Sequence, residues 1–538
     1  MAHSLSERMG APTATTLSSR QPTIHNCVMP LTSAVSTTHT ATRGPAPNSA
    51  NRRRDNAQIP PDERAGQAHV PRRSIRRLHT PATQPGQQRR SEYTIEPAAA
   101  DGLFAEWCRS GRNQPSSGEV PPGASHPQSS GHHPMGDHRV RLLEPGPHAA
   151  LSVELARLDI DEPWAQYMAH KGAVIVLRIE RVRGKAASLL KQHMLSLGGD
   201  CAVGRQVANF DDTPAPVVLL GTRLHYQQMI HKLAAQPFEL AAIAQEIAVA
   251  LERLAGPPEP IRCGEHLLRF DAGTLVMGII NTTPDSFSGD GLSGDVEAAL
   301  AQARRFVAEG ADILDVGGQS TRPGSDDVEL EEEIRRTAPV IAAICSELDV
   351  PVSVDTSRPQ VAEAAIAAGA SFINDIYALR RDGMLQVAAD SGAGVCLMHM
   401  QGTPGDMQQS PTYGDLMAEV YESLATWLEA AVAGGVCETQ IMIDPGFGFG
   451  KTVNHNIELV RRLRELTSLG RPILMGASRK SSIGTVLGLP DASQRLWGTA
   501  AVNTLAVANG AAMVRVHDVA EMAQVAAMAD AVLRGWGE

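Results

Sequence analysis

The sequence of 538 residues predicts an α/β protein whose carboxyl-terminal half is a (β/α)8 barrel, or TIM barrel. From residue 275 onward, short apolar runs of strand length alternate eight times with longer amphipathic runs. These units occupy roughly 265 residues, close to the roughly 250 residues typical of such a barrel. The third observation is a polar residue at the end of each expected strand. A doubly wound open sheet is the alternative, but it seldom needs eight units.

The expected barrel strands are continuous apolar runs, as in strands that are covered on both faces. They are residues 275–281, 313–317, 352–355, 372–376, 395–399, 441–444, 473–476 and 513–515. Between them lie stretches with apolar residues at helical spacing, which predict the outer helices. The clearest of these are residues 296–309, 331–348, 361–368, 416–433 and 457–466.

Four segments are expected along the chain. Residues 1–136 are rich in Ser, Thr, Pro, Gln and Arg and lack long apolar runs, which predicts a disordered segment. Residues 137–256 predict a small α+β domain, residues 257–270 a linker leading to the barrel, and residues 271–538 the barrel itself. Met135 immediately precedes the first globular sequence, so a translation start at Met135 is one explanation of residues 1–136. A solvated basic tail, a targeting segment and a nucleic-acid arm are the others.

The small domain is expected to alternate strands and helices. The expected strands are residues 174–182, 201–207 and 217–221, and the expected helices are residues 184–197, 224–235 and 240–254. Its histidines, His193, His225 and His231, are isolated from other chemistry-bearing residues. The sequence therefore assigns no catalytic role to this domain.

Composition restricts the class of function. The net charge of −11 argues against general nucleic-acid binding. The seven cysteines stand singly, without metal-site spacing or a disulfide framework, and Cys345 and Cys396 lie in apolar runs where we expect buried thiols. No apolar run reaches the roughly 20 residues that cross a membrane. We therefore expect a cytoplasmic enzyme acting on small molecules, without nucleic-acid or membrane partners.

Polar side chains follow the expected barrel strands. A single polar strand end is unremarkable, because Asp and Asn favour turns. In a (β/α)8 barrel, however, the carboxyl ends of all strands meet at one mouth, where catalytic groups gather. The residues at these ends are Asn281, Asp315, Asp355, Asn374, His399, Asp444, Ser478, Arg479, Lys480, Arg515 and His517.

The strand-end residues suggest two kinds of recognition. The carboxylates and amides of Asp355, Asn374, Asp444 and Asn281 suit a heterocycle with several N–H donors, since a carboxylate accepts two N–H groups at once. A cationic set with neighbouring hydroxyls suits a phosphate or pyrophosphate. Its members are Arg322, Lys480, Arg515, His517, Ser478 and Ser481. The stretch DPGFGFGK at residues 444–451 is not a P-loop, but its glycines permit a tight loop carrying Phe447 and Phe449.

Several motifs in this half of the chain resemble dihydropteroate synthases. They are, in order, MGIINTTPDSFSGDG, DILDVGGQSTRPGS, VSVDTSRP, FINDI, CLMHMQGTP, MIDPGFGFGK, GASRKSSIG and MVRVHDV, and they span nearly all of residues 275–533. The resemblance implies a transferase of folate biosynthesis. Such an enzyme joins 6-hydroxymethyl-7,8-dihydropterin diphosphate to 4-aminobenzoate and releases diphosphate. It implies Mg²⁺ as the cofactor, and we also expect a homodimer.

The resemblance implies roles for individual residues. Asp355, Asn374, Asp444 and Lys480 match the pterin pocket, and Asp355, Asp444 and Lys480 are the expected catalytic groups. Asn281 matches the residue that helps to hold Mg²⁺. Arg515 and His517 match the pyrophosphate site, while Thr321, Arg322, Pro323, Phe449 and Ser481 match the 4-aminobenzoate region. The motifs depart from the family at Gln319, where Glu is common, and in SFSGDG, where SFSDGG is common.

Two other functions stay open at this stage. A corrinoid-dependent methyltetrahydrofolate methyltransferase would share a carboxylate-rich pterin pocket. It would have no use for SRK and RVH as a diphosphate site, so these cations disfavour it. A non-catalytic pterin-binding module that regulates through the small domain is the other alternative, and the intact loop motifs argue against it.

Overall fold

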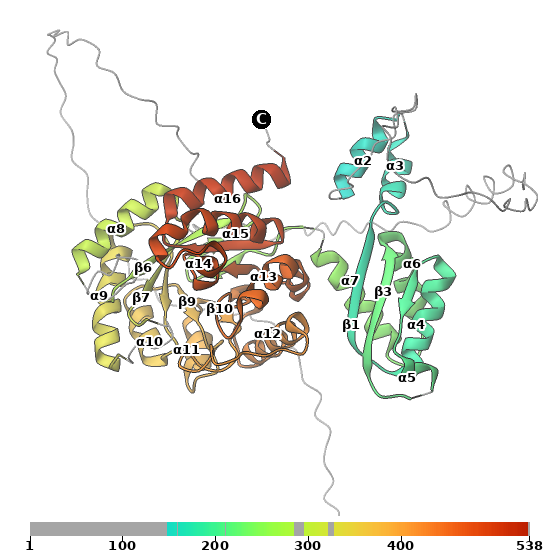
Figure 1. Ribbon diagram of the computed structural model, residues 1–538, viewed down its shortest axis with the longest axis horizontal. Helices are drawn as coiled ribbons and strands as arrows, with labels where there is room; N and C mark the ends of the chain where they lie inside the picture. Colours follow the sequence, from blue (N-terminus) through green and yellow to red (C-terminus); the bar gives the residue numbers. More distant parts are fainter. Residues whose placement is uncertain are drawn as a thin grey trace, which may run out of the picture. The chain divides into compact units, whose positions relative to one another are not determined.

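The computed structural model describes residues 148–535 except 159, 210, 255, 284–294 and 321–327. The predicted disordered segment, residues 1–136, therefore lies outside the described residues, as do residues 284–294 and 321–327 in the loops after the first two barrel strands. Figure 1 shows the barrel, with its helices labelled α8 to α16, and the small domain, where β1 and β3 are labelled.

The barrel prediction is confirmed. Parallel strands close in the order β10-β11-β12-β13-β6-β7-β8-β9, so each strand pairs with its sequence neighbours and β13 pairs with β6. Their bounds match the apolar runs to within two residues. The strands are β6 (Leu275–Asn281), β7 (Ile313–Gly317), β8 (Val352–Asp355), β9 (Phe372–Asp375), β10 (Gly394–Met398), β11 (Ile441–Asp444), β12 (Ile473–Met475) and β13 (Ala511–Val516).

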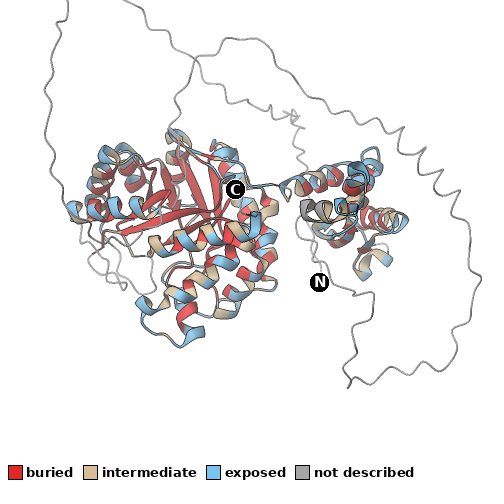
Figure 2. Cartoon of the chain, turned by 90° about the horizontal axis from the view of Figure 1, so that it is seen from above, coloured by how far each residue is buried: buried red, intermediate tan, exposed pale blue. Residues whose placement is uncertain are grey.

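Helices surround the barrel, and their apolar faces pack on the outside of the strands. They are α8 (Val296–Glu309), α9 (Leu330–Glu347), α10 (Pro359–Ala367), α11 (Met384–Ser391), α12 (Leu416–Ala433), α13 (Val453–Arg462), α14 (Ser481–Leu487), α15 (Leu496–Ala508) and α16 (Val519–Arg534). Short 3-10 turns lie at η1 (Glu438–Gln440), η2 (Leu463–Leu469) and η3 (Ala492–Arg495). Figure 2 shows the consequence: buried strands inside, and helices with one buried and one exposed face.

Local chemistry explains where helices begin and end. The Asp295 carboxylate accepts hydrogen bonds from the backbone N–H groups of Glu297 and Ala298 and so begins α8. Gly310 ends the same helix in the left-handed conformation. The helix predicted at residues 457–466 instead begins at Val453, because the Thr452 hydroxyl caps it, and its last part tightens into η2.

A β-hairpin closes the amino-terminal end of the barrel. Strands β4 (Ile261–Cys263) and β5 (His266–Leu268) pair antiparallel within the segment that the sequence suggested to be a linker. The buried side chains of Ile261, Leu268 and Phe270 contact the barrel interior. The interior residues of this layer include Leu275, Met277, Ile313, Phe372, Cys396, Met442, Leu474 and Met513. An apolar plug therefore fills this end of the barrel.

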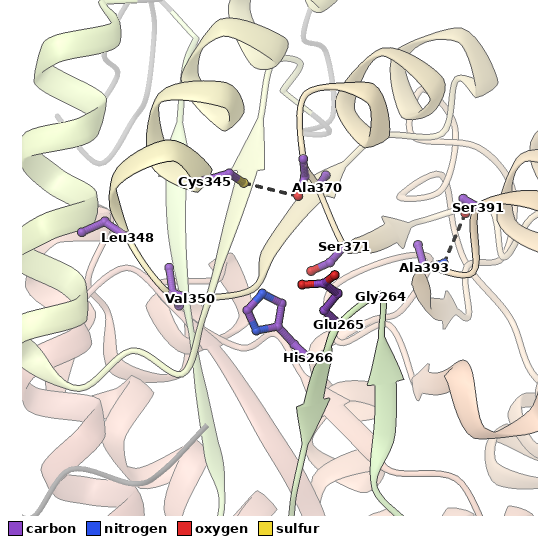
Figure 3. Close-up of a pocket in the computed structure, with 11 residues that line it drawn as sticks. Gly264, Glu265, His266, Cys345, Leu348, Val350, Ala370, Ser371, Ser391 and Ala393 are labelled. Atoms are coloured by element: carbon purple, nitrogen blue, oxygen red, sulfur yellow. Dashed lines mark hydrogen bonds between the residues drawn. The ribbon is translucent and has the colours of Figure 1, made fainter. Parts of the chain in front are cut away.

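A cavity of about 260 Å³ lies beside the hairpin (Figure 3). Glu265 and His266 of the hairpin turn face Ser371, which immediately precedes β9. Cys345, predicted to be buried, is partly exposed and also lines the cavity, whereas Cys396 is fully buried as predicted. Because these residues precede the strands, the cavity lies at the end of the barrel opposite the strand-end residues.

The small domain is an antiparallel sheet with helices. Its strands, in the order β1-β3-β2, are β1 (Val174–Val182), β2 (Asp200–Ala202) and β3 (Ala215–Thr222). Its helices are α2 (His148–Ala156), α3 (Glu162–Ala169), α4 (Gly184–Leu197), α5 (Arg205–Ala208), α6 (Arg223–Leu233) and α7 (Leu240–Arg253). The strand predicted at residues 201–207 is wrong in its second half, because Arg205–Ala208 forms α5.

Residue Tyr226 organises the core of the small domain. It is fully buried, and its hydroxyl has a single proton to share between the carbonyl oxygens of Ile175 and Leu219, at 2.8 and 3.0 Å. Burial raises the pKa of this hydroxyl, so it acts as a donor to the sheet and not as an acid. His193 Nε2 lies 3.1 Å from Gln236 Oε1, and His225 takes part in the capping box that begins α6.

Candidate active site

Charged side chains from β7, β8 and β13 meet at the carboxyl-terminal mouth of the barrel. The Arg515 guanidinium donates from Nε to Asp315 Oδ2 at 2.6 Å and from Nη2 to Asp355 Oδ2 at 2.7 Å. Both pairs are salt bridges, and the carboxylate of Asp315 is completely buried. Three residues that are far apart in the sequence are thus brought together by the closed barrel.

Asn374 on β9 extends this network. Its amide Nδ2 donates to Asp315 Oδ2 at 3.1 Å. The other carboxylate oxygen, Asp315 Oδ1, is buried and has no hydrogen-bond partner among the described residues. A buried acceptor without a partner is costly, and such atoms commonly mark a ligand or water position. Sequence reasoning placed Asp315 at a strand end but gave it no role, and the structure puts it at the centre.

The protonation of these groups reflects burial and their mutual charges. Burial raises the pKa of Asp355 to about 7; Arg515 opposes this shift, and Asp315 adds to it. For Arg515, burial lowers the pKa, but Asp315 and Asp355 outweigh it and hold the pKa above its usual value. The 2.7 Å hydrogen bond from the permanently charged guanidinium favours ionised Asp355, so burial weakens the ionised form without removing it.

Asp444 ends β11 on the same mouth. It is buried, and its Oδ1 accepts the backbone N–H of Gly446 at 2.7 Å. Burial raises its pKa to about 6, while the Gly446 N–H and the positive charges of Lys480, Lys451 and Arg515 act in the opposite direction. Since all three cations influence Asp444, this carboxylate belongs to the same electrostatic site as Arg515.

Lys480 follows β12 and immediately precedes α14. Its ammonium nitrogen lies 3.9 Å from the centre of the Phe449 ring, a cation–π contact. Ser481 is the first residue of α14 and is therefore next to Lys480 at the mouth. The structure thus brings Lys480 and Phe449 together from two different loops, and Ser481 adjoins Lys480 in the chain.

Other predicted residues are placed less centrally. His517 follows β13, and its Nδ1 lies 2.9 Å from Ser478 Oγ. Arg479, between Ser478 and Lys480, has a positive φ of 55° and donates from Nε to Asp518 at 3.0 Å. Its salt bridge with Asp518 ties the loops after β12 and β13 together. His399 is buried behind the mouth against Lys451, so it is not a free group facing a ligand.

The remaining predicted residues concern the metal and the second loop. Asn281 ends β6 and is partly exposed. Thr321, Arg322 and Pro323 lie outside the described residues. In the part of the chain that the structure describes, no group of three or more His, Cys, Asp or Glu side chains forms a metal site, and no helix is long and apolar enough to span a membrane.

Known proteins are similar to the barrel half of this chain. Residues 277–517 match the family described as pterin binding enzymes. The dihydropteroate synthase of Synechocystis sp. is 48% identical over 278 residues, a match that covers 52% of this chain and 96% of that protein. The chain belongs to the dihydropteroate synthase family. The Escherichia coli dihydropteroate synthase is 44% identical over 258 residues, covering 48% of this chain and 91% of the relative.

Structural similarity agrees with this family. The crystal structure of the Yersinia pestis dihydropteroate synthase, solved with a sulfonamide drug complex, matches with a TM-score of 0.50 and 42% identity. It covers 51% of this chain and 98% of that structure, so the match is confined to about half of the chain. Like other dihydropteroate synthases, this chain is a transferase of folate biosynthesis that condenses 6-hydroxymethyl-7,8-dihydropterin diphosphate with 4-aminobenzoate.

A longer relative also matches part of the small domain. The probable bifunctional folylpolyglutamate synthase/dihydropteroate synthase of Haloferax volcanii is 40% identical over 350 residues, covering 63% of this chain and 41% of that protein. This match is longer than the barrel, so it must extend into residues before it. The small domain therefore has a counterpart in at least one dihydropteroate synthase relative.

Proposed function

We propose that the strand-end residues described above carry the dihydropteroate synthase reaction, each with a separate task. The observation that carries this proposal is the network in which Asp315, Asp355, Asn374 and Arg515 meet beside Asp444 in one buried mouth. An apolar barrel interior has no structural need for three carboxylates, and burying them is costly unless a ligand uses them.

The pterin ring would be held by Asp444 and Asn374. A pterin presents paired N–H donors on its pyrimidine edge, and an ionised carboxylate can accept both. Asp444 has one oxygen bonded to the Gly446 N–H, which fixes the orientation of the carboxylate. The unpartnered Asp315 Oδ1 offers a further buried acceptor to a ligand N–H group.

The diphosphate would be held by cations at the rim. Arg515, Lys480 and His517 are the candidates among the described residues, and Arg322 would join them from the loop after β7. Arg515 is already engaged by Asp315 and Asp355. A diphosphate that draws on Arg515 would weaken these pairs and leave more uncompensated negative charge on the two carboxylates.

That redistribution of charge suits the reaction step. The amino nitrogen of 4-aminobenzoate forms a bond to the pterin methylene carbon, the carbon–oxygen bond breaks, and diphosphate leaves with the electron pair. The amine then loses a proton. As the carbon–oxygen bond breaks, positive charge develops on the methylene group, and a carboxylate such as Asp355 stabilises it electrostatically. No side-chain nucleophile is required.

Mg²⁺ is proposed as the cofactor, and Asn281 is the described residue that would hold it. Mg²⁺ is commonly bound through one or two protein oxygens together with substrate phosphates and water. Asn281 supplies an amide oxygen at the end of β6, and no hydrogen bond of its side chain is present within the described ranges. When bound there, Mg²⁺ would neutralise charge on the departing diphosphate.

A homodimer through α15 and α16 is also proposed. These helices pack against each other and expose Trp497, Leu505, Met528 and Val532, with 79%, 55%, 65% and 71% of each residue accessible. Large exposed apolar side chains on adjacent helices favour burial against a second copy. Sedimentation should give twice the chain mass, and Val532→Glu should shift the measured mass toward that of the monomer.

A cytoplasmic location is proposed as well, and fractionation of cells producing the protein would test it.

The direct test of the function is diphosphate release from the purified protein. Release that requires both 6-hydroxymethyl-7,8-dihydropterin diphosphate and 4-aminobenzoate is the expected outcome. Formation of 7,8-dihydropteroate should match diphosphate in equal amounts. Pterin binding without any turnover would support the non-catalytic module instead, and methyl transfer from methyltetrahydrofolate to a corrinoid would support the methyltransferase.

A further inference from the structure

Lys451 is a buried lysine that the reaction does not use directly. It follows the loop after β11, and only 2% of the residue is exposed. Its ammonium lies 2.9 Å from His399 Nδ1 and donates to the carbonyl oxygens of Gly446 at 3.1 Å and Phe449 at 3.0 Å. A longer contact of 3.4 Å reaches the His399 carbonyl oxygen, so four acceptors surround the three N–H donors of the ammonium. Burial lowers the pKa of Lys451 to about 7, and the negative charge of Asp444 opposes this shift.

The acceptors belong to the loop that carries Phe449. Gly446 and Gly448 have φ values of 69° and 82°, a backbone conformation that residues other than glycine seldom adopt. A side chain at Gly446 would collide with the carbonyl oxygen of His399, so the loop is wound tightly against the end of β10. Lys451 therefore occupies the centre of a turn whose carbonyl groups point inward.

The other partner, His399, is held in a suitable state. Burial lowers its pKa to about 2, and the nearby charge of Lys451 adds to this effect. The imidazole is therefore neutral near pH 7, with Nδ1 as the acceptor for the ammonium and Nε2 carrying the proton. Its ring also stacks on Trp427 at 5.8 Å between centres, which fixes its plane.

The loop held in this way contacts Lys480, a proposed catalytic residue. Phe449 contributes one of the carbonyl groups that Lys451 binds, and its ring supports the Lys480 ammonium at 3.9 Å. A Cβ atom at Gly448 would lie 3.1 Å from Lys480 Cδ, so this backbone and the Lys480 stem are in close contact. Movement of the loop would displace Lys480 and the Phe449 ring together.

We propose that Lys451 is a positioning residue: its buried ammonium, paired with neutral His399, holds the β11–α13 loop so that Phe449 and Lys480 are placed for 4-aminobenzoate and the pterin. This inference rests on the proposed function. It assigns to Lys451 a role that no substrate contact provides, because the ammonium is enclosed by carbonyl oxygens and an imidazole.

The test compares Lys451→Met with a matched control. Methionine keeps a linear side chain of similar length and removes the donors. Lys451→Met should raise KM for 4-aminobenzoate about tenfold or more, whereas Val460→Ala, a core substitution in α13 next to the loop, should lower Tm and leave KM within about twofold. Equal KM values for the two variants would overturn the inference, because the lysine would then contribute to stability alone.

A double-mutant cycle separates positioning from general loosening. If Lys451 acts through Phe449, then Phe449→Leu and Lys451→Met should raise KM by similar factors, and the double variant should be no worse than either single one. If the KM increases of the two single variants instead multiplied in the double variant, Lys451 would not act through Phe449, and the inference would be overturned. Should Lys451→Met not fold, the same comparison is made with Lys451→Gln, which retains an amide donor. Failure of the parent protein to release diphosphate with 4-aminobenzoate would reject the proposed function and is thereby distinguished from failure of this inference.

Discussion

At the amino-terminal end of the barrel the interior is apolar, whereas at the carboxyl-terminal end the same strands bury charge. Ile261, Phe270 and Met277 represent the first end, where the β4–β5 hairpin packs on the strand starts. Asp315 and Arg515 represent the second, where the side chains of strand ends pair with each other. The interior of a (β/α)8 barrel is filled by side chains in layers, so the chemistry can differ between layers while the backbone stays regular.

Stability and activity should therefore depend on opposite ends of the same strands. The apolar end gains free energy simply by removing surface from water. The polar end loses the hydration of its charges, and the pairs within it repay only part of that cost. We therefore expect substitutions in the plug to act on unfolding, and substitutions in the mouth to act mainly on ligands and turnover.

The largest effect, and the one that tests this separation most severely, is expected for Arg515→Met. It leaves Asp315 and Asp355 without their cation, which we expect to cost about 3–5 kcal/mol of stability. Diphosphate-substrate affinity should also fall about ten- to a hundredfold, since charge-assisted hydrogen bonds are lost. Urea unfolding and calorimetry with the diphosphate and with a pterin lacking it give both values.

A second substitution distinguishes the two roles of Arg515. Asp315→Asn added to Arg515→Met removes one of the uncompensated charges and should recover part of the stability without recovering diphosphate binding. If stability and diphosphate binding recovered together, Arg515 would support the fold and would not bind the diphosphate.

Phe270→Ala tests the apolar end. Removing this buried ring should cost about 3–5 kcal/mol of unfolding free energy. The kcat/KM of the folded fraction should stay within about twofold of the parent, because the plug lies at the end of the barrel remote from the mouth. A loss of kcat/KM that persists after correction for the folded fraction would show that the two ends are coupled.

A smaller effect is expected when Asp444 and Asp355 are changed to Asn. Asp444→Asn places a donor against the ligand's own donor and should weaken pterin binding by about 1–3 kcal/mol. Asp355→Asn should lower kcat more than pterin affinity if Asp355 stabilises the developing cation. Calorimetry of pterin binding and measurement of kcat in both variants test these two roles. Unchanged pterin affinity in Asp444→Asn, or equal losses of affinity and kcat in Asp355→Asn, would contradict these roles.

The smallest effect concerns pH. Burial raises the pKa of Asp444 to about 6 and that of Asp355 to about 7, so both carboxylates lose charge as pH falls through this range. We expect kcat/KM to fall from pH 7.5 to 6.5, by less than about tenfold for a single group near pKa 7. Asp355→Asn should move the acid limb to lower pH. A profile that is identical in the variant would assign the limb to another group.

The raised pKa values of Asp355 and Asp444 also determine how the free energy of unfolding changes with pH. Because the folded-state pKa values lie above the unfolded values near 4, the folded chain binds protons more tightly. These two groups therefore favour folding at low pH and lose that contribution as pH rises from about 4 to about 7. Asp444→Asn and Asp355→Asn should each flatten this part of the urea-unfolding free energy against pH.

Much of the barrel could be predicted because its signals are local. The run at residues 275–281 is strand-like by length and apolar content alone, and the capping residue Asp295 precedes the helix beginning at Val296. The polar residues at strand ends could also be recognised, since a parallel barrel brings all such ends to one mouth. The hairpin at residues 261–268 escaped recognition because its strands are three residues each and sit among turn-forming residues.

The sequence by itself determined the fold class, the order of the strands and the set of residues at the mouth, because periodicity and strand length depend on neighbouring residues. Only the tertiary structure decided which of those residues are partners. Asp315 and Arg515 are 200 positions apart, and no local pattern records that their side chains meet at 2.6 Å. Likewise, Lys451 resembles a solvated lysine after a glycine-rich loop. It is buried because the loop folds around it and His399 arrives from another strand.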